Sequence, residues 1–439
     1  MYKTDISIDF DKINKKIENL ELTISEGRVK KIIGLTVEVE GIKAFVGELC
    51  VIYNQVNKPV NCEVVGFKDK EVILMALGEL TLIAPGCKVI SKGILLSVMC
   101  SDNLLGKVLD GLGNPIDNSD AVLGDRYNLN NEPPDPMKRK KIRNIMETGV
   151  RAIDAFTTCG EGQRIGIFAG SGVGKSTTLG MIARNAKADV NVIALIGERG
   201  REVLDFIDKD LGEEGMKKSV VVCATSDKAP LVRLKGALTA TAIAEYFRDQ
   251  GKKVILMMDS VTRFAMAQRE VGVAIGEPPA QKGYTPSVFA MLPKLMERTG
   301  TSDKGSITAF YTVLVDGDDF NEPIADTTRG ILDGHIVLSR DLANKNHYPS
   351  IDVLNSLSRL MNEIASKEDI KIASFARDML AEYREAEDLI NIGAYASGTN
   401  KKIDEAIYYH EHIINFLKQG INEKSSFNET ISSLRRVFE

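Results

Sequence analysis

The chain has 439 residues, of which 44% are apolar and 27% charged, and its formal net charge is −5 at pH 7. This length predicts two to four domains, and the composition is typical of soluble globular proteins. The acidic balance argues against a general nucleic-acid binder. None of the six cysteines forms a C-x-x-C pair, which favours reduced thiols in a cytosolic protein over a zinc or redox site. We find neither a signal-peptide core nor a run of roughly 20 apolar residues that could span a bilayer.

Residues 1–24 predict a short helical appendage. Four apolar residues recur there at near-helical spacing, with Lys and Glu between them: Phe10, Ile13, Ile17 and Leu20. Such a stripe either packs on the body of the protein or docks a partner, and the sequence leaves both open.

Residues 25–93 consist of short β-rich runs separated by turns that contain Gly and Asn. This spacing predicts a small all-β barrel or sandwich. Two stretches rich in Gly or Pro follow, at 104–117 and 131–143. The second also carries a basic cluster that could bind nucleic acid or another subunit, but we favour a solvated connector beside the next domain.

The central part of the chain, 94–365, predicts an α/β domain. Continuous apolar runs such as RIGIFAG and KKVILMMD alternate with helical segments. Continuous apolarity is typical of parallel strands that are covered on both faces, so we expect a mostly parallel sheet. After about residue 365 strand signals stop, and 366–439 predict a helical domain. Its last segment places four apolar residues on one stripe: Phe427, Ile431, Leu434 and Phe438.

The most specific motif is AGSGVGKST at 169–177, which follows a predicted strand and precedes a predicted helix. Its glycines allow backbone N–H groups to turn toward phosphate oxygens, and the helix N-terminus favours an anion. Lys175 would reach the β- and γ-phosphates, and the Ser176 hydroxyl would ligate Mg²⁺. Ala169 replaces the first glycine of the usual pattern. The predicted nucleotide-binding residues of the loop are Gly170, Ser171, Gly172, Val173, Gly174, Lys175, Ser176 and Thr177.

Two acidic residues follow predicted strands elsewhere in this domain. Asp259 ends the apolar run KKVILMMD, at the sheet edge where ligands bind in open α/β sheets, so we expect it to hold Mg²⁺. The alternative is an Asp that caps the next helix. Glu198 in VIALIGERGRE could orient the attacking water, although by itself it could equally be a solvated surface residue.

Taken in order, these motifs resemble those of the catalytic subunits of rotary ATPases and their secretion relatives. The resemblance rests on ETGVRAIDAF, FAGSGVGKST, GERGREV, ILMMDSVTRFA and PSIDVLNSLS, and it covers the chain from about residue 25 to the end. Residues 276–300 and 317–340 resemble the flagellar and type III secretion branch. This resemblance implies that 94–365 form a P-loop nucleotide domain of RecA-like type. It also implies a homo-hexameric, Mg²⁺-dependent ATPase at the cytoplasmic face of a membrane export apparatus. It also implies a stator-like regulatory subunit at the N-terminal segment, together with export gate, stalk, chaperone and substrate partners.

Residue roles follow from the same resemblance. It implies that Glu198 is the catalytic carboxylate, with Arg199 as a neighbouring cation on the phosphate side. Asp259 would be the second acid of the Mg²⁺ site. Arg359 would reach the nucleotide of a neighbouring subunit, and Tyr348 would stack near adenine.

Four alternatives stay open at this stage. An RNA-translocating hexamer uses a similar core, but we find no aromatic-rich basic strand of the kind that stacks bases. A non-catalytic nucleotide-binding ring subunit is disfavoured by the presence of Glu198. A catalytic subunit of a rotary ATP synthase is also compatible with these motifs. Within secretion, we favour a flagellar system over a virulence-type injectisome.

Overall fold

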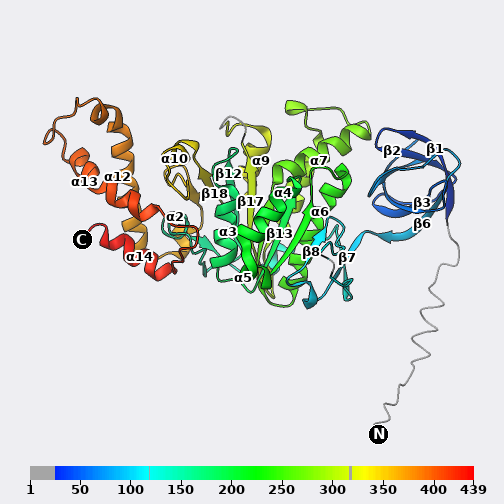
Figure 1. Ribbon diagram of the computed structural model, residues 1–439, viewed down its shortest axis with the longest axis horizontal. Coiled ribbons are helices and arrows are strands. Elements are labelled where there is room, and N and C mark those ends of the chain that lie inside the picture. Colours follow the sequence, from blue (N-terminus) through cyan, green and yellow to red (C-terminus); the bar gives the residue numbers. More distant parts are fainter. Residues whose placement is uncertain (1–24, 118, 316–318) are drawn as a thin grey trace, which may run out of the picture. The chain divides into compact units, whose positions relative to one another are not determined.

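The computed structural model describes residues 25–117, 119–315 and 319–439. The chain divides into two compact units, of which the first ends at Leu96 and the second begins at Ser97 (Figure 1). The predicted appendage over 1–24 lies outside the described residues. Within the described ranges, no helix combines the length and the apolarity needed to cross a membrane.

The first unit contains a closed six-stranded antiparallel barrel. Its strands pair in the order β1-β2-β5-β4-β3-β6, and β6 returns to β1. Side chains alternate along β1 between solvent and the interior, which is filled by apolar residues such as Val37, Ile52 and Leu74. The sequence left barrel and sandwich open, and the β1–β6 pairing decides for the barrel. The strands are β1 (Glu26–Ile33), β2 (Thr36–Glu40), β3 (Glu48–Tyr53), β4 (Pro59–Lys68), β5 (Glu71–Ala76) and β6 (Lys88–Leu95).

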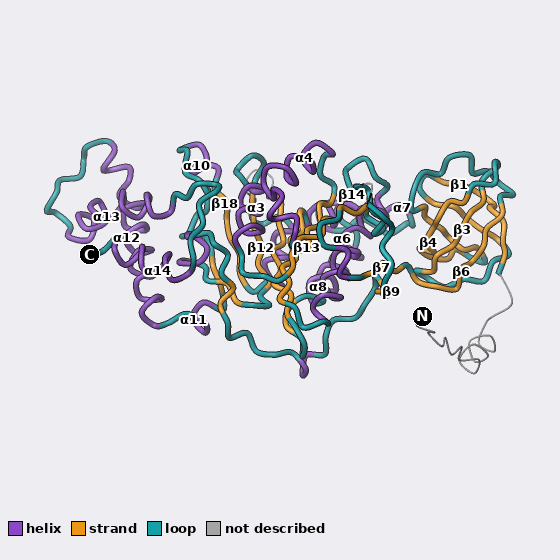
Figure 2. Tube along the Cα trace, turned by 60° about the horizontal axis from the view of Figure 1, so that its bottom comes forward, coloured by secondary structure: helices purple, strands orange, loops and turns teal. Residues whose placement is uncertain are grey.

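The second unit is built on a nine-stranded, mostly parallel sheet, as predicted. Eight strands follow the order β19-β18-β12-β17-β15-β13-β14-β8, and β16 pairs with β17. Figure 2 labels four of these strands, β18, β12, β13 and β14, which lie across the sheet in that sequence. Antiparallel pairing occurs at β18–β19 and at β16–β17. The strands are β8 (Val108–Asp110), β12 (Arg164–Ala169), β13 (Val190–Ile196), β14 (Ser219–Ala224), β15 (Lys253–Asp259), β16 (Gly300–Thr301), β17 (Ser306–Leu314), β18 (Gly334–Leu338) and β19 (Leu357–Ser358).

Helices cover the sheet and bury its strands on both faces. Every residue of β13 and β14 is buried, which explains why these strands are continuously apolar in the sequence. The long helix α6 (Pro230–Asp249) packs on β13, β14 and β15, while α7 (Val261–Ala274) packs on β17. The other helices of this region are α2 (Arg151–Phe156), α3 (Lys175–Asn185), α4 (Gly200–Asp205), α5 (Gly212–Lys217), α8 (Pro286–Glu297), α9 (Pro323–Ile331) and α10 (Arg340–Asn344).

The C-terminal part of the second unit is helical, as predicted. It contains α11 (Met361–Ile364), α12 (Lys367–Asn391), α13 (Lys401–Leu417) and α14 (Phe427–Arg436). Ser426 begins α14 with a capping box, because its hydroxyl accepts from the Glu429 N–H and the Glu429 carboxylate accepts from the Ser426 N–H. Of the predicted apolar stripe, Ile431 and Leu434 are buried, and Leu434 joins the core that also contains α2.

Short elements complete the unit. These are β7 (Ser97–Cys100), β9 (Asp125–Asn128), β10 (Ile145–Met146), β11 (Cys159–Gly160), the 3₁₀ turns η1 (Asp102–Leu104), η2 (Pro136–Lys138) and η4 (Gln281–Gly283), and the π-helical turn η3 (Phe206–Leu211). Arg298 and Glu245 of α6 form a fully buried bidentate ion pair, with N–O distances of 2.8 and 2.7 Å.

Candidate active site

The phosphate loop lies between β12 and α3, in the strand–loop–helix order that the motif predicts. Gly172 and Gly174 have φ angles of +76° and +89°, in the left-handed region that favours glycine. Gly174 is the N-cap of α3, so Lys175 is the first residue of the helix. The Ser350 hydroxyl donates to the Val173 carbonyl at 2.6 Å and fixes the loop from below. The loop therefore presents a helix N-terminus toward the cavity above it.

Three predicted residues meet at the carboxyl edge of the sheet. The Lys175 ammonium lies 2.5 Å from an Asp259 carboxylate oxygen and 3.5 Å from Glu198 Oε1. Asp259 ends β15, and Glu198 follows β13 by two residues. Thr312 of β17 donates from its hydroxyl to the same Asp259 oxygen at 2.8 Å. Parallel strands thus bring together side chains that are 84 residues apart in the chain.

The charges of this cluster perturb one another. Burial alone would lower the pKa of Lys175, but the carboxylates of Asp259 and Glu198 outweigh it and raise this pKa. Burial raises the pKa of Glu198 to about 7; Lys175 opposes this shift, whereas Asp259 and Glu202 add to it. A carboxylate with a pKa near neutrality is suited to accept a proton at physiological pH.

A cavity of about 820 Å³ opens above the loop and the cluster. Its wall includes Arg263, in the first turn of α7, which we did not predict from the sequence. The Nε atom of Arg263 is buried and has no hydrogen-bond partner among the described residues, and its Nη1 atom lies 4.0 Å from the Met266 sulfur. Its position in MMDSVTRF, four residues after Asp259, could have identified it from the sequence.

A second cavity, of about 350 Å³, adjoins the first and shares Gly172, Gly174 and Thr177 with it. Tyr348, which the family resemblance predicts to stack near adenine, lies on the wall of this cavity. Gln419 and Ile421, from the loop between α13 and α14, also line this cavity. Sequence reasoning missed both of these residues.

Two predicted cations do not join the cluster within one chain. Arg199 lines the mouth of the larger cavity, but its side chain is 73% exposed and pairs with Glu202 at 3.2 Å. Arg359 lies at the opposite edge of the sheet, since its N–H donates to the Asp333 carbonyl, which directly precedes β18. The residues of the phosphate cavity do not include Arg359.

The donors beside the loop fit a magnesium ion held together with phosphate. Ser176 and Asp259 offer a hydroxyl and a carboxylate, the hard oxygen ligands that Mg²⁺ takes in nucleotide sites. Within the described part of the chain, no three His, Cys, Asp or Glu side chains gather into a metal site. A cage made of protein ligands alone is thus absent from that part, and the donors present suit an ion shared with a nucleotide.

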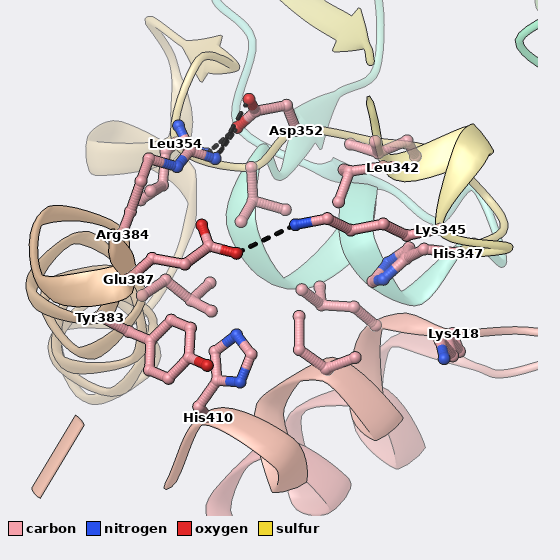
Figure 3. Close-up of a pocket in the computed structure, with 15 residues that line it drawn as sticks. Leu342, Lys345, His347, Asp352, Leu354, Tyr383, Arg384, Glu387, His410 and Lys418 are labelled. Carbon is pink, nitrogen blue, oxygen red and sulfur yellow. Dashed lines mark hydrogen bonds and ion pairs between the residues drawn. The ribbon is translucent and has the colours of Figure 1, made fainter. Parts of the chain in front are cut away.

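A separate cavity of about 210 Å³ lies between the segment after α10 and the helices α12 and α13 (Figure 3). Two ion pairs lie at this cavity: Lys345 with Glu387 at 3.0 Å, and Arg384 with Asp352 at 3.2 Å. Burial lowers the pKa of His347 to about 4, with a smaller effect from Lys418, so this imidazole is neutral at pH 7. None of the residues predicted from the sequence lines this cavity.

Comparisons with known proteins agree with this geometry. Three family models match the chain: the beta-barrel domain of the ATP synthase alpha/beta family over 29–93, its nucleotide-binding domain over 149–358, and the T3SS EscN ATPase C-terminal domain over 365–436. The flagellum-specific ATP synthase of Bacillus subtilis (strain 168) is 55% identical over 429 residues, covering 96% of this chain and 98% of the relative. The chain belongs to the family of flagellum-specific ATP synthases and type 3 secretion system ATPases.

Both branches of this family are similar to the chain. The type 3 secretion system ATPase of Xanthomonas euvesicatoria is 48% identical, covering 97% of each chain. The structure of the assembled ATPase EscN, from the type III secretion system of enteropathogenic E. coli, aligns with a TM-score of 0.90 and 46% identity. It covers 94% of this chain and all of EscN. A second structure, of assembled EscN in complex with its central stalk EscO, aligns with a TM-score of 0.87 and 45% identity.

Proposed function

We propose that this chain is a Mg²⁺-dependent ATP hydrolase that drives protein export by the flagellar apparatus. The observation that carries this proposal is the contact of Lys175 with both Glu198 and Asp259 above the phosphate loop. A lysine for phosphates, an acid for the metal and a second acid with a raised pKa are the groups that ATP hydrolysis requires. Flagellum-specific ATP synthases among the relatives support the export role.

In this proposal each group has a distinct task. The loop N–H groups and Lys175 bind the β- and γ-phosphates, so Lys175 leaves the two carboxylates when nucleotide enters. Ser176 and Asp259 would hold Mg²⁺, and a bound ion would supply positive charge that stabilises the phosphate oxygens. Glu198 then orients the attacking water and accepts its proton, and the Arg263 guanidinium faces the γ-phosphate.

We infer that the active form is a homo-hexamer. Arg359 would complete the site of a neighbouring subunit, and Arg199 would add positive charge at the cavity mouth. The structures of EscN, which describe an assembled ATPase and its complex with a central stalk, support a ring with a stalk partner. The remaining proposed partners are a stator-like subunit at residues 1–24, the export gate, chaperones and export substrates. Together they would hold the ring at the cytoplasmic face of the membrane.

A virulence-type export ATPase is the second candidate, because type 3 secretion system ATPases are nearly as similar as the flagellar relatives. The experiment is to place the gene in a Bacillus subtilis strain that lacks its own flagellum-specific ATP synthase, and in a Xanthomonas euvesicatoria strain that lacks its secretion ATPase. We expect the wild-type chain to restore swimming in the first strain and Glu198→Gln to fail there. Restored secretion in Xanthomonas without swimming in Bacillus would favour the second candidate. A purified chain that hydrolyses ATP but restores neither process would refute the export role and retain the ATPase.

A further inference from the structure

The cavity between the segment after α10 and the helices α12 and α13 has room for a ligand with one ring (Figure 3). Its volume is about 210 Å³, and an apolar protein cavity of about 150 Å³ already takes up benzene. Most of its wall is apolar. The aliphatic side chains that line it are Leu342, Ile351, Val353, Leu354, Leu380, Ile414 and Leu417. These side chains would bind the hydrophobic part of a ligand by excluding water from it.

Two stacked rings form another part of the wall. The Tyr383 ring of α12 and the His410 ring of α13 have centroids 3.5 Å apart and planes that differ by 9°. Aromatic side chains bind a second aromatic ring with more affinity than its buried area alone provides, because edge and face carry opposite partial charges. This pair therefore favours an aromatic ligand over a branched aliphatic one.

His347 contributes a polar atom that has no partner within the protein. The residue lines the cavity and is only 3% exposed. Its Nε2 atom is buried and forms no hydrogen bond with any described residue. Buried polar atoms are nearly always hydrogen-bonded, so this nitrogen points to a ligand that carries a complementary polar group.

The charged side chains of the cavity leave one positive charge unbalanced. Three of them are cations and two are carboxylates: Lys345, Arg384, Lys418, Asp352 and Glu387. Each carboxylate pairs with one cation, at 3.0 and 3.2 Å. Lys418 forms no ion pair with any described residue, and its charge helps to lower the pKa of His347. The remaining positive charge thus acts at the imidazole whose Nε2 is unpaired, and it favours an anionic group there.

The two ion pairs lie where the cavity meets solvent. The side chains of Lys345 and Arg384 are more than half exposed, and both pairs connect α12 to the segment after α10. Ion pairs at such exposed positions contribute little to stability. They can separate at low cost, which gives a small ligand a route to the apolar interior.

We propose that this cavity binds a small aromatic monocarboxylate, a ligand of the benzoate class. The ring would lie among the aliphatic side chains and against Tyr383. The carboxylate would accept a hydrogen bond from His347 Nε2, in the tautomer that carries its hydrogen there, and would lie within the field of Lys418. The cavity shares no lining residue with either cavity at the phosphate loop, so this is a separate site.

The first test measures binding of four small probes to the full-length chain by saturation-transfer NMR and calorimetry. The probes are benzoate, benzyl alcohol, benzylamine and acetate. We expect benzoate to bind with a dissociation constant of about 1 mM or below, as a ligand of its size allows. The other three should bind at least about tenfold more weakly, because each lacks either the negative charge or the ring. Benzoate should also raise the melting temperature, since it binds only the folded chain.

Two variants locate the site. His347→Phe keeps a ring and removes Nε2, so it should weaken benzoate about tenfold or more while leaving benzyl alcohol nearly unchanged. Lys418→Met changes an exposed residue, so it keeps the assignment testable if His347→Phe does not fold, and it should weaken benzoate about twofold to fivefold. Lys401→Met is the matched control, because Lys401 is also an exposed lysine of the helical region but does not line the cavity. It should bind benzoate as the wild type does.

Three outcomes would overturn the inference. The first is an absence of benzoate binding up to about 10 mM, a weak limit for a ligand of this size. The second is binding of benzyl alcohol as tight as that of benzoate, or benzoate binding that neither His347→Phe nor Lys418→Met weakens. The third is loss of benzoate when Mg²⁺ and ADP are added at saturating concentration, because this would place the carboxylate on the phosphate loop instead.

Discussion

Arg359 cannot act on the nucleotide of its own chain, and this makes a sharp prediction. Its N–H bonds the Asp333 carbonyl, and the Asp333 N–H in turn bonds the Arg164 carbonyl at the start of β12. The phosphate loop follows Ala169 at the other end of the same strand. Five residue steps at about 3.3 Å each separate the two edges by roughly 17 Å, farther than an arginine side chain extends. A direct contact of the Arg359 side chain with a nucleotide would therefore require a neighbouring subunit.

The perturbation is a mixture of two inactive proteins, Arg359→Ala and Glu198→Gln. Each should bind ATP and turn over poorly. For Arg359→Ala we expect a loss of about 10³–10⁵-fold, the range found when such an arginine is removed in other phosphoryl-transfer enzymes. In a mixed ring, an Arg359→Ala subunit keeps its Glu198. If a Glu198→Gln subunit lies on its correct side, that neighbour offers an intact Arg359. One interface is then complete, and mixed rings should regain part of the wild-type ATPase rate.

The assay is steady-state phosphate release as a function of the mixing ratio, after fluorescence energy transfer has shown that subunits exchange. Mixtures of wild-type protein with either variant run in parallel, because strict cooperativity around the ring would suppress activity in those mixtures too. Action of Arg359 in trans would be refuted by one combination of results. In that combination the subunits exchange and the mixtures with wild-type protein stay active, but the two variants do not rescue each other.

Three further results are expected. Lys175→Ala should lose nucleotide affinity, whereas Glu198→Gln should bind nucleotide but fail to hydrolyse it, as equilibrium binding and steady-state hydrolysis would show. Normal turnover of Glu198→Gln would remove that residue from the mechanism. Glu198 must be deprotonated to accept a proton, and its pKa is raised to about 7, so kcat/KM should fall as the pH drops through 7. Glu202 contributes to this raised pKa, so Glu202→Gln should move the acid limb of the pH profile to lower pH. An acid limb that does not move would count against the assignment of Glu198. Arg298→Met should leave the buried Glu245 carboxylate without its ion-pair partner and lower the free energy of unfolding by about 3–5 kcal/mol. Urea titration measures this change, and a decrease below about 1 kcal/mol would contradict the prediction.

The cluster at the phosphate loop follows from rules that act over short stretches of sequence. The loop motif is contiguous, and Asp259 is recognised because it ends a continuous apolar strand. Parallel strands align their carboxyl ends, so the rule that ligands bind at that edge brings Asp259 to Lys175 without further information. These residues meet as expected, with a 2.5 Å contact between the two side chains.

Other parts of the site depend on tertiary packing that no local pattern encodes. Arg263 lies in a helix, where an arginine usually faces solvent. In the structure its side chain packs against Gly197, and both residues line the phosphate cavity. Gln419 lies in a loop between two helices, and its partners are 268 and 270 residues away in the chain. The closure of the barrel also depends on distant strands, since Glu26 pairs with Ile90.

At the cavity beside Tyr348, a group of hydrogen bonds joins the nucleotide domain to the C-terminal helices. Arg151 of α2 donates to the Phe416 carbonyl at 2.9 Å and to the Lys418 carbonyl, both at the end of α13. Gln419 connects the same loop to the Gly149 carbonyl and, through its N–H, to the carbonyl of Tyr348. A base that stacks on Tyr348 therefore contacts a loop whose position is set by the helical domain. These hydrogen bonds connect the loop beside Tyr348 to both α2 and α13, so a nucleotide that displaced this loop would also act on the helical domain.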